Sequence, residues 1–228
     1  MEFTGIDKMS LLDYDDLVSV VLFTPKCNFR CPFCHNGLTV LDSEEVIPFD
    51  QIVNYLNSRK GLIDAVVITG GEPTLMPELK ERIVILRNMG FKIKLDTNGT
   101  NPDVLKDLVN DGLLDYVAMD IKNSMKMYPE TCGVCKVNEE RIKESIDFLI
   151  SNKVDYEFRT TLVDEYHSME SITSMADLIK GAKKLYLQKF VDREGVIKKG
   201  LHEVSQEKAE NFASKLRKSV EQVSLRGY

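Results

Sequence analysis

Short apolar runs alternate with segments of helical pattern along most of the chain. Six of these runs are rich in Val, Ile, Leu, Tyr or Phe and are bounded by turn residues, which is typical of buried strands. The predicted strands are Val18–Phe23, Ala65–Thr69, Lys92–Asp96, Tyr116–Ile121, Tyr156–Leu162 and Lys184–Phe190. The predicted helices span residues 49–59, 77–89, 102–110, 138–151, 170–181 and 205–218.

Proline and glycine mark several of the expected helix ends. Pro77 and Pro102 stand where the first turn of a helix tolerates proline, and Asn101 is the expected cap of the second helix. Gly90 and Gly112 stand where helices commonly end in the left-handed conformation. The alternation of strands and helices predicts parallel strands joined by crossover helices.

The number of βα units indicates the fold class. Six units favour an α/β fold of the open partial (β/α)6 barrel type, because a closed eight-stranded barrel needs about 250 residues. A doubly wound sheet is the alternative. No repeat, low-complexity tract or linker interrupts the chain, so we expect a single domain over residues 1–228. Its core would span about residues 16–190, followed by a helical or extended tail over residues 191–228.

Composition excludes several classes of protein. Among the 228 residues, 43% are hydrophobic and 29% are charged, which is ordinary for a soluble globular protein. The net charge of -6 argues against a nucleic-acid partner. The longest apolar run, Leu17–Pro25, is shorter than the roughly 20 residues that cross a bilayer, and the start lacks a basic signal-peptide region. We therefore expect a cytoplasmic protein without a membrane partner.

Cysteine usage points to a metal. Five cysteines are too few, and odd in number, for a disulfide framework. Three of them, Cys27, Cys31 and Cys34, follow the first predicted strand within one loop. Three thiolates can hold a [4Fe-4S] cluster while leaving one iron without a protein ligand. Considered alone, this segment also fits a zinc site with His35 as the fourth ligand.

Polar residues follow the next predicted strands as well, where parallel α/β folds bind ligands. The second strand leads into Gly70-Gly71-Glu72-Pro73, which fits either a simple turn or a place where a ligand approaches the backbone. The third leads into Asp96-Thr97-Asn98-Gly99, which also fits an ordinary Asn-Gly turn. On the fifth strand, Arg159 would be costly inside a barrel unless it met an anion or a hydrogen-bonding ligand.

The cysteine loop with Phe33, together with the Gly70–Pro73 turn, resembles the radical S-adenosylmethionine (SAM) family. Within that family the chain most resembles glycyl-radical-enzyme activases of the anaerobic ribonucleoside-triphosphate reductase type. The resemblance covers residues 5–190, and the segments that carry it are Gly5–Tyr14, Cys27–Asn36 and Asp155–Thr161. The chain departs from these activases at Asp15-Asp16, where they usually carry Pro-Gly.

The resemblance implies a reaction. A [4Fe-4S] cluster would bind SAM through its open iron, and one electron would cleave SAM into methionine and a 5′-deoxyadenosyl radical. That radical would remove a hydrogen atom from a backbone glycine of a glycyl radical enzyme. The expected partner is anaerobic ribonucleotide reductase, with a flavodoxin or ferredoxin as electron donor. The alternatives are a small-molecule radical SAM enzyme such as 7-carboxy-7-deazaguanine synthase, or a non-catalytic iron–sulfur or zinc protein.

The resemblance also implies roles for residues on the first three loops. Phe33 and Asn36 would lie at the adenine. The turn formed by Gly70, Gly71 and Glu72 would hold the methionyl amine, with Glu72 able to accept a hydrogen bond from an ammonium group. Asp96 and Asn98 would lie beside the ribose and the methionyl carboxylate.

The later strands supply the remaining candidates. Lys122 would pair with the carboxylate of SAM, and Arg159 would contact the same cofactor. Asp96 and Asp120 together would hold a monovalent cation, with a surface salt bridge as the alternative. Gln188, near the end of the sixth strand, is the candidate for an adenosine contact.

Three further features receive no functional role from the sequence. Cys132-Gly133-Val134-Cys135 has the spacing of a redox or zinc motif but lacks two further ligands. His35 is expected to be a hydrogen-bonding neighbour of the cluster, not a ligand. His167 is expected to lie in a solvated loop.

Overall fold

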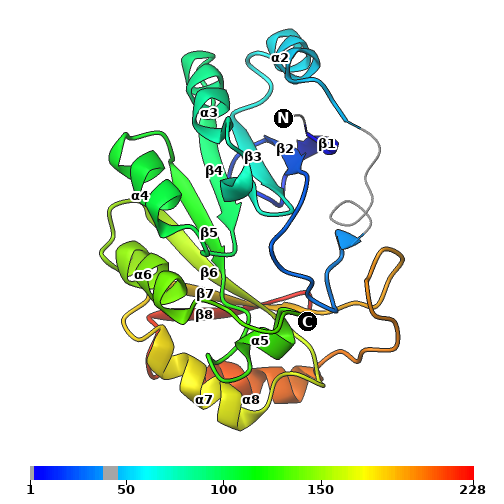
Figure 1. The fold of residues 1–228 in the computed structure, drawn as a ribbon, viewed down its shortest axis with the longest axis vertical. Coiled ribbons are helices and arrows are strands. Elements are labelled where there is room, and N and C mark those ends of the chain that lie inside the picture. The colour runs from blue at the N-terminus through cyan, green and yellow to red at the C-terminus, as the bar shows by residue number, and fades with distance from the viewer. Residues whose placement is uncertain (1–2, 38–45) are drawn as a thin grey trace.

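The computed structural model describes residues 3–37 and 46–228. Within them, eight strands form one sheet in sequential order, from β1 to β8 (Figure 1). The strands are β1 (Gly5–Ser10), β2 (Ser19–Thr24), β3 (Ala65–Gly70), β4 (Lys92–Thr97), β5 (Tyr116–Asp120), β6 (Asp155–Leu162), β7 (Lys184–Lys189) and β8 (Gln222–Arg226).

Each strand from β2 to β7 is followed by a helix before the next strand begins. The helices are α2 (Phe49–Ser58), the 3-10 helix η1 (Pro73–Leu75), α3 (Leu79–Asn88), α4 (Pro102–Asn110), α5 (Tyr128–Thr131), α6 (Glu139–Ile150), α7 (Met169–Leu178) and α8 (Gln206–Leu216). No helix in the described part of the chain is long and apolar enough to cross a membrane.

The sheet has the topology of an open barrel. Neighbouring strands from β2 to β8 are parallel, and β1 joins the edge of β2 in the antiparallel direction. The main helices lie on the outer side of the curved sheet (Figure 1). Sequential order without a reversal point excludes the doubly wound alternative. The predicted partial barrel with six βα units is confirmed.

Apolar runs form the central strands because both faces of those strands are covered. In β3, the four residues Ala65–Ile68 are all fully buried. Parallel sheets produce such continuous runs because helices pack on one face and the barrel interior lies on the other. The polar candidate residues lie at or after the carboxyl ends of these strands, as the sequence predicts.

The sequence missed the two edge strands, β1 and β8, and the one-turn helix α5. β1 reads Gly-Ile-Asp-Lys-Met-Ser and leaves three of its six residues exposed, so it carries no apolar run. β8 has only five residues. Edge strands of this kind form because a neighbouring strand supplies the hydrogen bonds, and local composition gives little sign of them.

The departure at Asp16 from the activases that the sequence resembles has a conformational explanation. Asp16 adopts a left-handed backbone with φ of 63°. Glycine reaches this region without steric cost, and Asp is among the few other residues that visit it as single positions. The turn before β2 is therefore compatible with Asp in place of Gly.

An ionic contact inside the barrel ties β8 to β6. Glu157 on β6 is 1% exposed. Its two carboxylate oxygens accept hydrogen bonds from the guanidinium of Arg226, at 3.2 and 3.3 Å, and one also accepts from the hydroxyl of Tyr116 at 3.2 Å. The C-terminal strand thus neutralises a buried carboxylate.

Replacing Arg226 with alanine tests this contact. The variant leaves Glu157 buried without its cation, so we expect the free energy of unfolding to fall by about 2 kcal/mol in urea denaturation. The control is Lys143→Ala, which removes an exposed pair with Glu139 at 3.5 Å and is expected to cost less than about 1 kcal/mol. Equal, small losses in the two variants would show that β8 is not held by this contact.

Candidate active site

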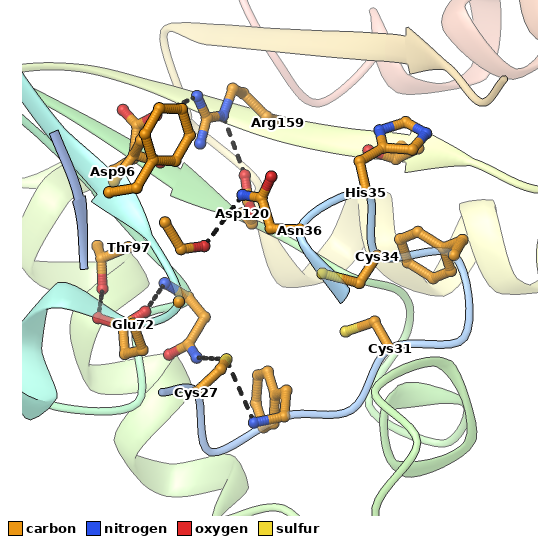
Figure 2. A pocket seen from close by; sticks show the side chains of 18 of the residues that line it. Cys27, Cys31, Cys34, His35, Asn36, Glu72, Asp96, Thr97, Asp120 and Arg159 are labelled. Atoms are coloured by element: carbon orange, nitrogen blue, oxygen red, sulfur yellow. Dashed lines mark hydrogen bonds and ion pairs between the residues drawn. The ribbon is translucent and has the colours of Figure 1, made fainter. Parts of the chain in front are cut away.

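A cavity of about 350 Å³ lies at the carboxyl ends of the strands. Its lining brings together every candidate that the sequence nominated, from six different strand ends. Figure 2 labels several of them, including the three cysteines, Glu72 and Arg159. These residues are Cys27, Phe33, Cys31, Cys34, Asn36, Gly70, Gly71, Glu72, Asp96, Asn98, Asp120, Lys122, Arg159 and Gln188.

The cysteine loop follows β2 and presents three free thiols to the cavity. Figure 2 shows the sulfur atoms of Cys27, Cys31 and Cys34 turned toward the same open space. The amide of Cys34 donates to the carbonyl of Cys31 at 3.0 Å, which curls this part of the loop. The amide of Phe29 donates to the Sγ of Cys27 at 3.4 Å. An all-sulfur donor set on one loop fits an iron–sulfur cluster.

The three thiols differ in their ionisation. Burial raises the pKa of Cys27 to about 11 and also raises the pKa of Cys34. A hydrogen bond from Cys132 lowers the pKa of Cys31 to about 7 against the opposing effect of burial. Metals bind the thiolate form of cysteine. Metal ions that occupy this buried site must therefore displace the protons of the three thiols.

His35 does not complete a zinc site in this structure. Its Nε2 lies 3.0 Å from the carbonyl oxygen of Val191, and its Nδ1 lies 3.5 Å from the guanidinium of Arg193. Its ring stacks on Phe190 with the centroids 5.8 Å apart. Both ring nitrogens therefore face the segment after β7, and neither is turned to the cysteines.

The glycine turn after β3 packs against the backbone of the cysteine loop. A Cβ on Gly71 would lie 1.8 Å from the carbonyl oxygen of Lys26, and one on Gly70 would lie 2.4 Å from the amide nitrogen of Thr24. The amide of Gly71 donates to the carbonyl of Thr24 at 2.9 Å. The amide of Glu72 donates to the carbonyl of Lys26 at 2.8 Å. No side chain fits between the two loops, so glycine is required there.

Glu72 is engaged by the protein itself. It is 1% exposed, and its Oε1 accepts hydrogen bonds from the amide of Thr74 at 3.2 Å, the hydroxyl of Thr74 at 2.6 Å and the hydroxyl of Thr97 at 2.7 Å. Its Oε2 accepts from the amide of Asn98 at 2.6 Å. The carboxylate therefore joins the turn after β3 to the turn after β4 (Figure 2). The sequence did not single out Thr97 for this contact.

Two carboxylates and two cations form a network on the inner wall. The guanidinium of Arg159 lies between the carboxylates of Asp96, at 2.9 Å, and Asp120, at 3.0 Å. The ammonium of Lys122 lies 2.8 Å from the other oxygen of Asp120. The expected monovalent cation between Asp96 and Asp120 is therefore not supported, because Arg159 reaches both carboxylates and supplies that positive charge.

The network determines the ionisation of Asp120. Burial alone would raise the pKa of this carboxyl group. The positive charges of Lys122 and Arg159 outweigh burial and lower the pKa to about 2. Asp96 differs from Asp120 in one respect: its Oδ1 is buried and accepts no hydrogen bond from the described residues, with the ammonium of Lys94 3.7 Å away.

The other nominated residues differ in how firmly the protein holds them. Phe33 is 5% exposed and its ring lies 6.2 Å from that of Tyr166. The side-chain Nδ2 of Asn36 donates to the carbonyl of Gly70 at 3.2 Å, which links the end of the cysteine loop to the glycine turn. Gln188 lines the cavity from β7.

The structure adds residues that the sequence did not nominate. Asp13, Arg193 and Ile197 also line the cavity. Arg193 and Ile197 belong to a segment of mixed composition without a motif, so no sequence signal identified them.

His167 is 1% exposed, and the prediction that it lies in a solvated loop is wrong. Its Nδ1 accepts from the amide of Val163 at 3.1 Å and its Nε2 donates to the carbonyl of Lys122 at 3.0 Å.

Comparison with known proteins identifies the family. The model of the Radical SAM superfamily matches residues 21–179. The chain therefore belongs to the radical SAM superfamily.

Relatives within the superfamily differ in how much of the chain they match. A Methanocaldococcus jannaschii protein, provisionally named a glycyl-radical enzyme activating enzyme, is 35% identical over 196 residues, which cover 84% of this chain and 80% of that protein. A second protein of that organism, with the same provisional name, is 25% identical and matches 70% of this chain and 62% of its own length. The 7-carboxy-7-deazaguanine synthase of Aquifex aeolicus is 33% identical over 84 residues, or 37% of each chain.

A solved structure has the same fold. It is a domain of a pyruvate-formate lyase-activating enzyme from Bacteroides vulgatus, with a TM-score of 0.58 and 17% identity. The match covers 72% of this chain and 99% of that domain.

Substituting Gly71 tests the contact between the two loops. In Gly71→Ala the new Cβ would overlap the carbonyl of Lys26, so we expect the free energy of unfolding to fall by about 3 kcal/mol and iron uptake to be lost. The control is Gly90→Ala, where nothing lies within 4 Å and only the left-handed backbone costs about 1 kcal/mol. Urea denaturation and iron content measure both effects, and a Gly71→Ala protein as stable and iron-rich as the control would contradict this packing.

The low pKa of Asp120 predicts a stability change in acid. A carboxyl group with a lowered pKa stabilises the folded state above its ordinary pKa of 3.8, and this contribution is lost as the pH falls toward about 2. We expect Asp120 to contribute roughly 2 kcal/mol through this linkage. The free energy of unfolding should fall more steeply between pH 4 and pH 2 in the wild type than in Asp120→Asn. Stability profiles of the wild type and Asp120→Asn that run parallel between pH 4 and pH 2 would contradict the network. The control is Asp103→Asn, which removes a carboxylate from an exposed ion pair.

Proposed function

We propose that this protein is a glycyl-radical-enzyme activase that uses one [4Fe-4S] cluster and SAM. The observation that carries the proposal is the convergence of three free thiols from one loop with the polar ends of the later strands, all around one cavity. The relative from M. jannaschii, which matches most of both chains, supports the activase assignment.

Cys27, Cys31 and Cys34 would hold the cluster. Three thiolates leave one iron without a protein ligand, which gives SAM a place to bind. When bound, the cluster would supply one electron that cleaves SAM to methionine and a 5′-deoxyadenosyl radical, the species that removes a hydrogen atom from the partner's glycine. The residues of the chain bind and orient the cofactors and exclude water.

The end of the cavity near the glycine turn would hold the amino-acid part of SAM. Gly70 and Gly71 allow close approach to the backbone. Glu72 fixes the shape of this turn through Thr97 and Asn98, in addition to any contact with the amine. The ammonium of Lys122 carries three protons, so after pairing with Asp120 it retains donors for the SAM carboxylate.

The opposite wall would hold the nucleoside. The Oδ1 of Asp96, which accepts no hydrogen bond from the described residues, is a suitable acceptor for a ribose hydroxyl. Phe33 and Asn36 would lie at the adenine, with Gln188 as a further adenosine contact. Arg159, which touches Asp96 and Asp120, and Lys122, which touches Asp120, would together balance the two negative charges of this wall.

The partner we propose is anaerobic ribonucleotide reductase, with a flavodoxin or ferredoxin as the source of electrons. This part of the proposal depends on the resemblance of Gly5–Tyr14 and Asp155–Thr161 to that activase type. A small-molecule radical SAM enzyme such as 7-carboxy-7-deazaguanine synthase is the second candidate. It is supported less well, because the relative with that activity matches 37% of the chain.

The proposal is tested by anaerobic reconstitution and electron paramagnetic resonance. We expect the reconstituted protein to cleave SAM to 5′-deoxyadenosine under reducing conditions and to generate a glycyl radical on anaerobic ribonucleotide reductase. Cys34→Ala should lose the cluster and at least about 100-fold of the cleavage rate, since it removes a cluster ligand. The matched control is Cys135→Ala, which removes an exposed cysteine and should leave both unchanged.

Each alternative has its own outcome in this experiment. Turnover of the pterin substrate of 7-carboxy-7-deazaguanine synthase, without a glycyl radical on any partner, would favour the small-molecule enzyme. A cluster whose spectrum does not respond to SAM would favour an electron carrier. Stoichiometric zinc in place of iron would contradict the radical SAM activity altogether.

A further inference from the structure

The segment that follows β7 packs against the end of the cysteine loop. This segment, residues 191–200, forms neither a helix nor a strand and is called the β7 exit segment. The amide of Lys198 donates to the carbonyl of Pro32 at 2.8 Å. A Cβ on Gly37 would lie 2.6 Å from the carbonyl oxygen of Gly195. The backbone of the exit segment is therefore fitted closely against the backbone of the cysteine loop.

Contacts within the exit segment fix the backbone of Arg193. The carbonyl of Arg193 accepts hydrogen bonds from the amide of Val196 at 3.2 Å and from the ammonium of Lys199 at 2.5 Å. The carboxylate of Asp192 accepts from the amide of Gly200 at 3.0 Å. Val196 is 5% exposed and anchors the segment in the core. The protein itself thus sets the position from which the Arg193 side chain extends.

The side chain of Arg193 lines the cavity and has few contacts of its own. Its guanidinium lies 3.5 Å from the Nδ1 of His35. It forms no ion pair with any of the described residues, whereas Lys122 and Arg159 are each paired with Asp120. A guanidinium carries five N–H donors, so most of those on Arg193 are available to a ligand.

Exposure separates Arg193 from the two cations on the inner wall. The side chains of Lys122 and Arg159 are 18% and 14% exposed. Arg193 is an exposed residue. Because Arg193 is exposed and also lines the cavity, it lies at the rim, where a large partner can reach it from solvent.

The chemistry of a glycine substrate limits what a cation at this rim can recognise. Glycine has no side chain, so an enzyme can hold the glycine itself only through the peptide groups beside it. Each peptide carbonyl accepts hydrogen bonds, and arginine presents several donors in one plane. The carboxylate of SAM already has Lys122 as its proposed partner. The unpaired guanidinium therefore matches the peptide carbonyl groups of an incoming protein chain.

We propose that Arg193 is a specificity-determining residue that donates hydrogen bonds to the peptide carbonyl groups beside the glycine of the partner enzyme. This inference rests on the proposed function, because it takes the substrate to be a glycine within a protein. In this account Arg193 contacts the partner, and it contacts neither the cluster nor SAM.

The test compares two activities of each reconstituted protein. The first is the cleavage of SAM to 5′-deoxyadenosine by dithionite-reduced protein without a partner, over a range of SAM concentrations. The second is glycyl radical formation, read by electron paramagnetic resonance, over a range of concentrations of anaerobic ribonucleotide reductase. Iron content is measured on each protein.

The variants are Arg193→Ala, which removes the donors, and Arg193→Lys, which keeps the charge. The matched control is Lys198→Ala. It removes an exposed cation from the same segment, and Lys198 is not among the described residues that line the cavity.

We expect Arg193→Ala to raise the KM for the partner at least about tenfold, because hydrogen bonds from a charged donor are lost. The rate at saturating partner, the KM for SAM and the iron content should stay within about twofold of the wild type, since the lost contact is made only with the partner. Arg193→Lys should lie between the two, because an ammonium lacks the planar set of donors. Lys198→Ala should match the wild type in every measurement.

Several results would overturn this inference while leaving the proposed function intact. One is a KM for the partner that is unchanged in Arg193→Ala. Another is a higher KM for SAM in the cleavage without a partner, which would assign Arg193 to the cofactor. If Arg193→Ala loses iron, Arg193→Lys decides: a wild-type KM for the partner overturns the inference, and a raised KM at unchanged iron content supports it.

The wild type alone tests the proposed function in the same experiment. If it cleaves no SAM, or forms no glycyl radical on the reductase, the proposed function fails and the inference fails with it.

Discussion

The packing of two backbone loops against each other is the constraint on which the site depends. The glycine turn after β3 approaches the cysteine loop so closely that a Cβ on Gly71 would lie 1.8 Å from the carbonyl oxygen of Lys26. The same pair of loops is joined by the hydrogen bond from Glu72 to Lys26 at 2.8 Å. Parallel strands bring the loops to one edge of the sheet, and the absence of side chains lets them touch. The positions of the thiols relative to the remaining strand ends follow from this contact.

Charge compensation is the second requirement of the cavity. Its inner wall carries two carboxylates, Asp96 and Asp120, in a largely buried setting where isolated charges are costly. Arg159 spans both, and Lys122 neutralises the free oxygen of Asp120. The wall is therefore preorganised by the protein, and the Oδ1 of Asp96 is a buried oxygen on it that accepts no hydrogen bond from the described residues.

Sequence patterns predicted the parts of this molecule that depend on local composition. The apolar runs of β2 to β7 and the polar residues after them are local signals, and the barrel follows from their alternation. Contacts between distant residues could not be predicted in the same way. The sequence shows two carboxylates suited to a cation, but not that Arg159 reaches both. It shows the spacing of Cys132 and Cys135, but not that the carbonyl of Cys132 accepts a hydrogen bond from the amide of Arg30 in the cysteine loop. It places His167 in a loop without showing that the core covers it.

The central claim is that the cysteine loop leaves one iron free for SAM. The most direct measurement is electron–nuclear double resonance on the reduced cluster with SAM labelled with 15N at the methionyl amine. The account predicts a hyperfine coupling between the cluster and the labelled nitrogen, since the amine would bind the open iron. No coupling, with all four irons bound by protein side chains, would contradict it.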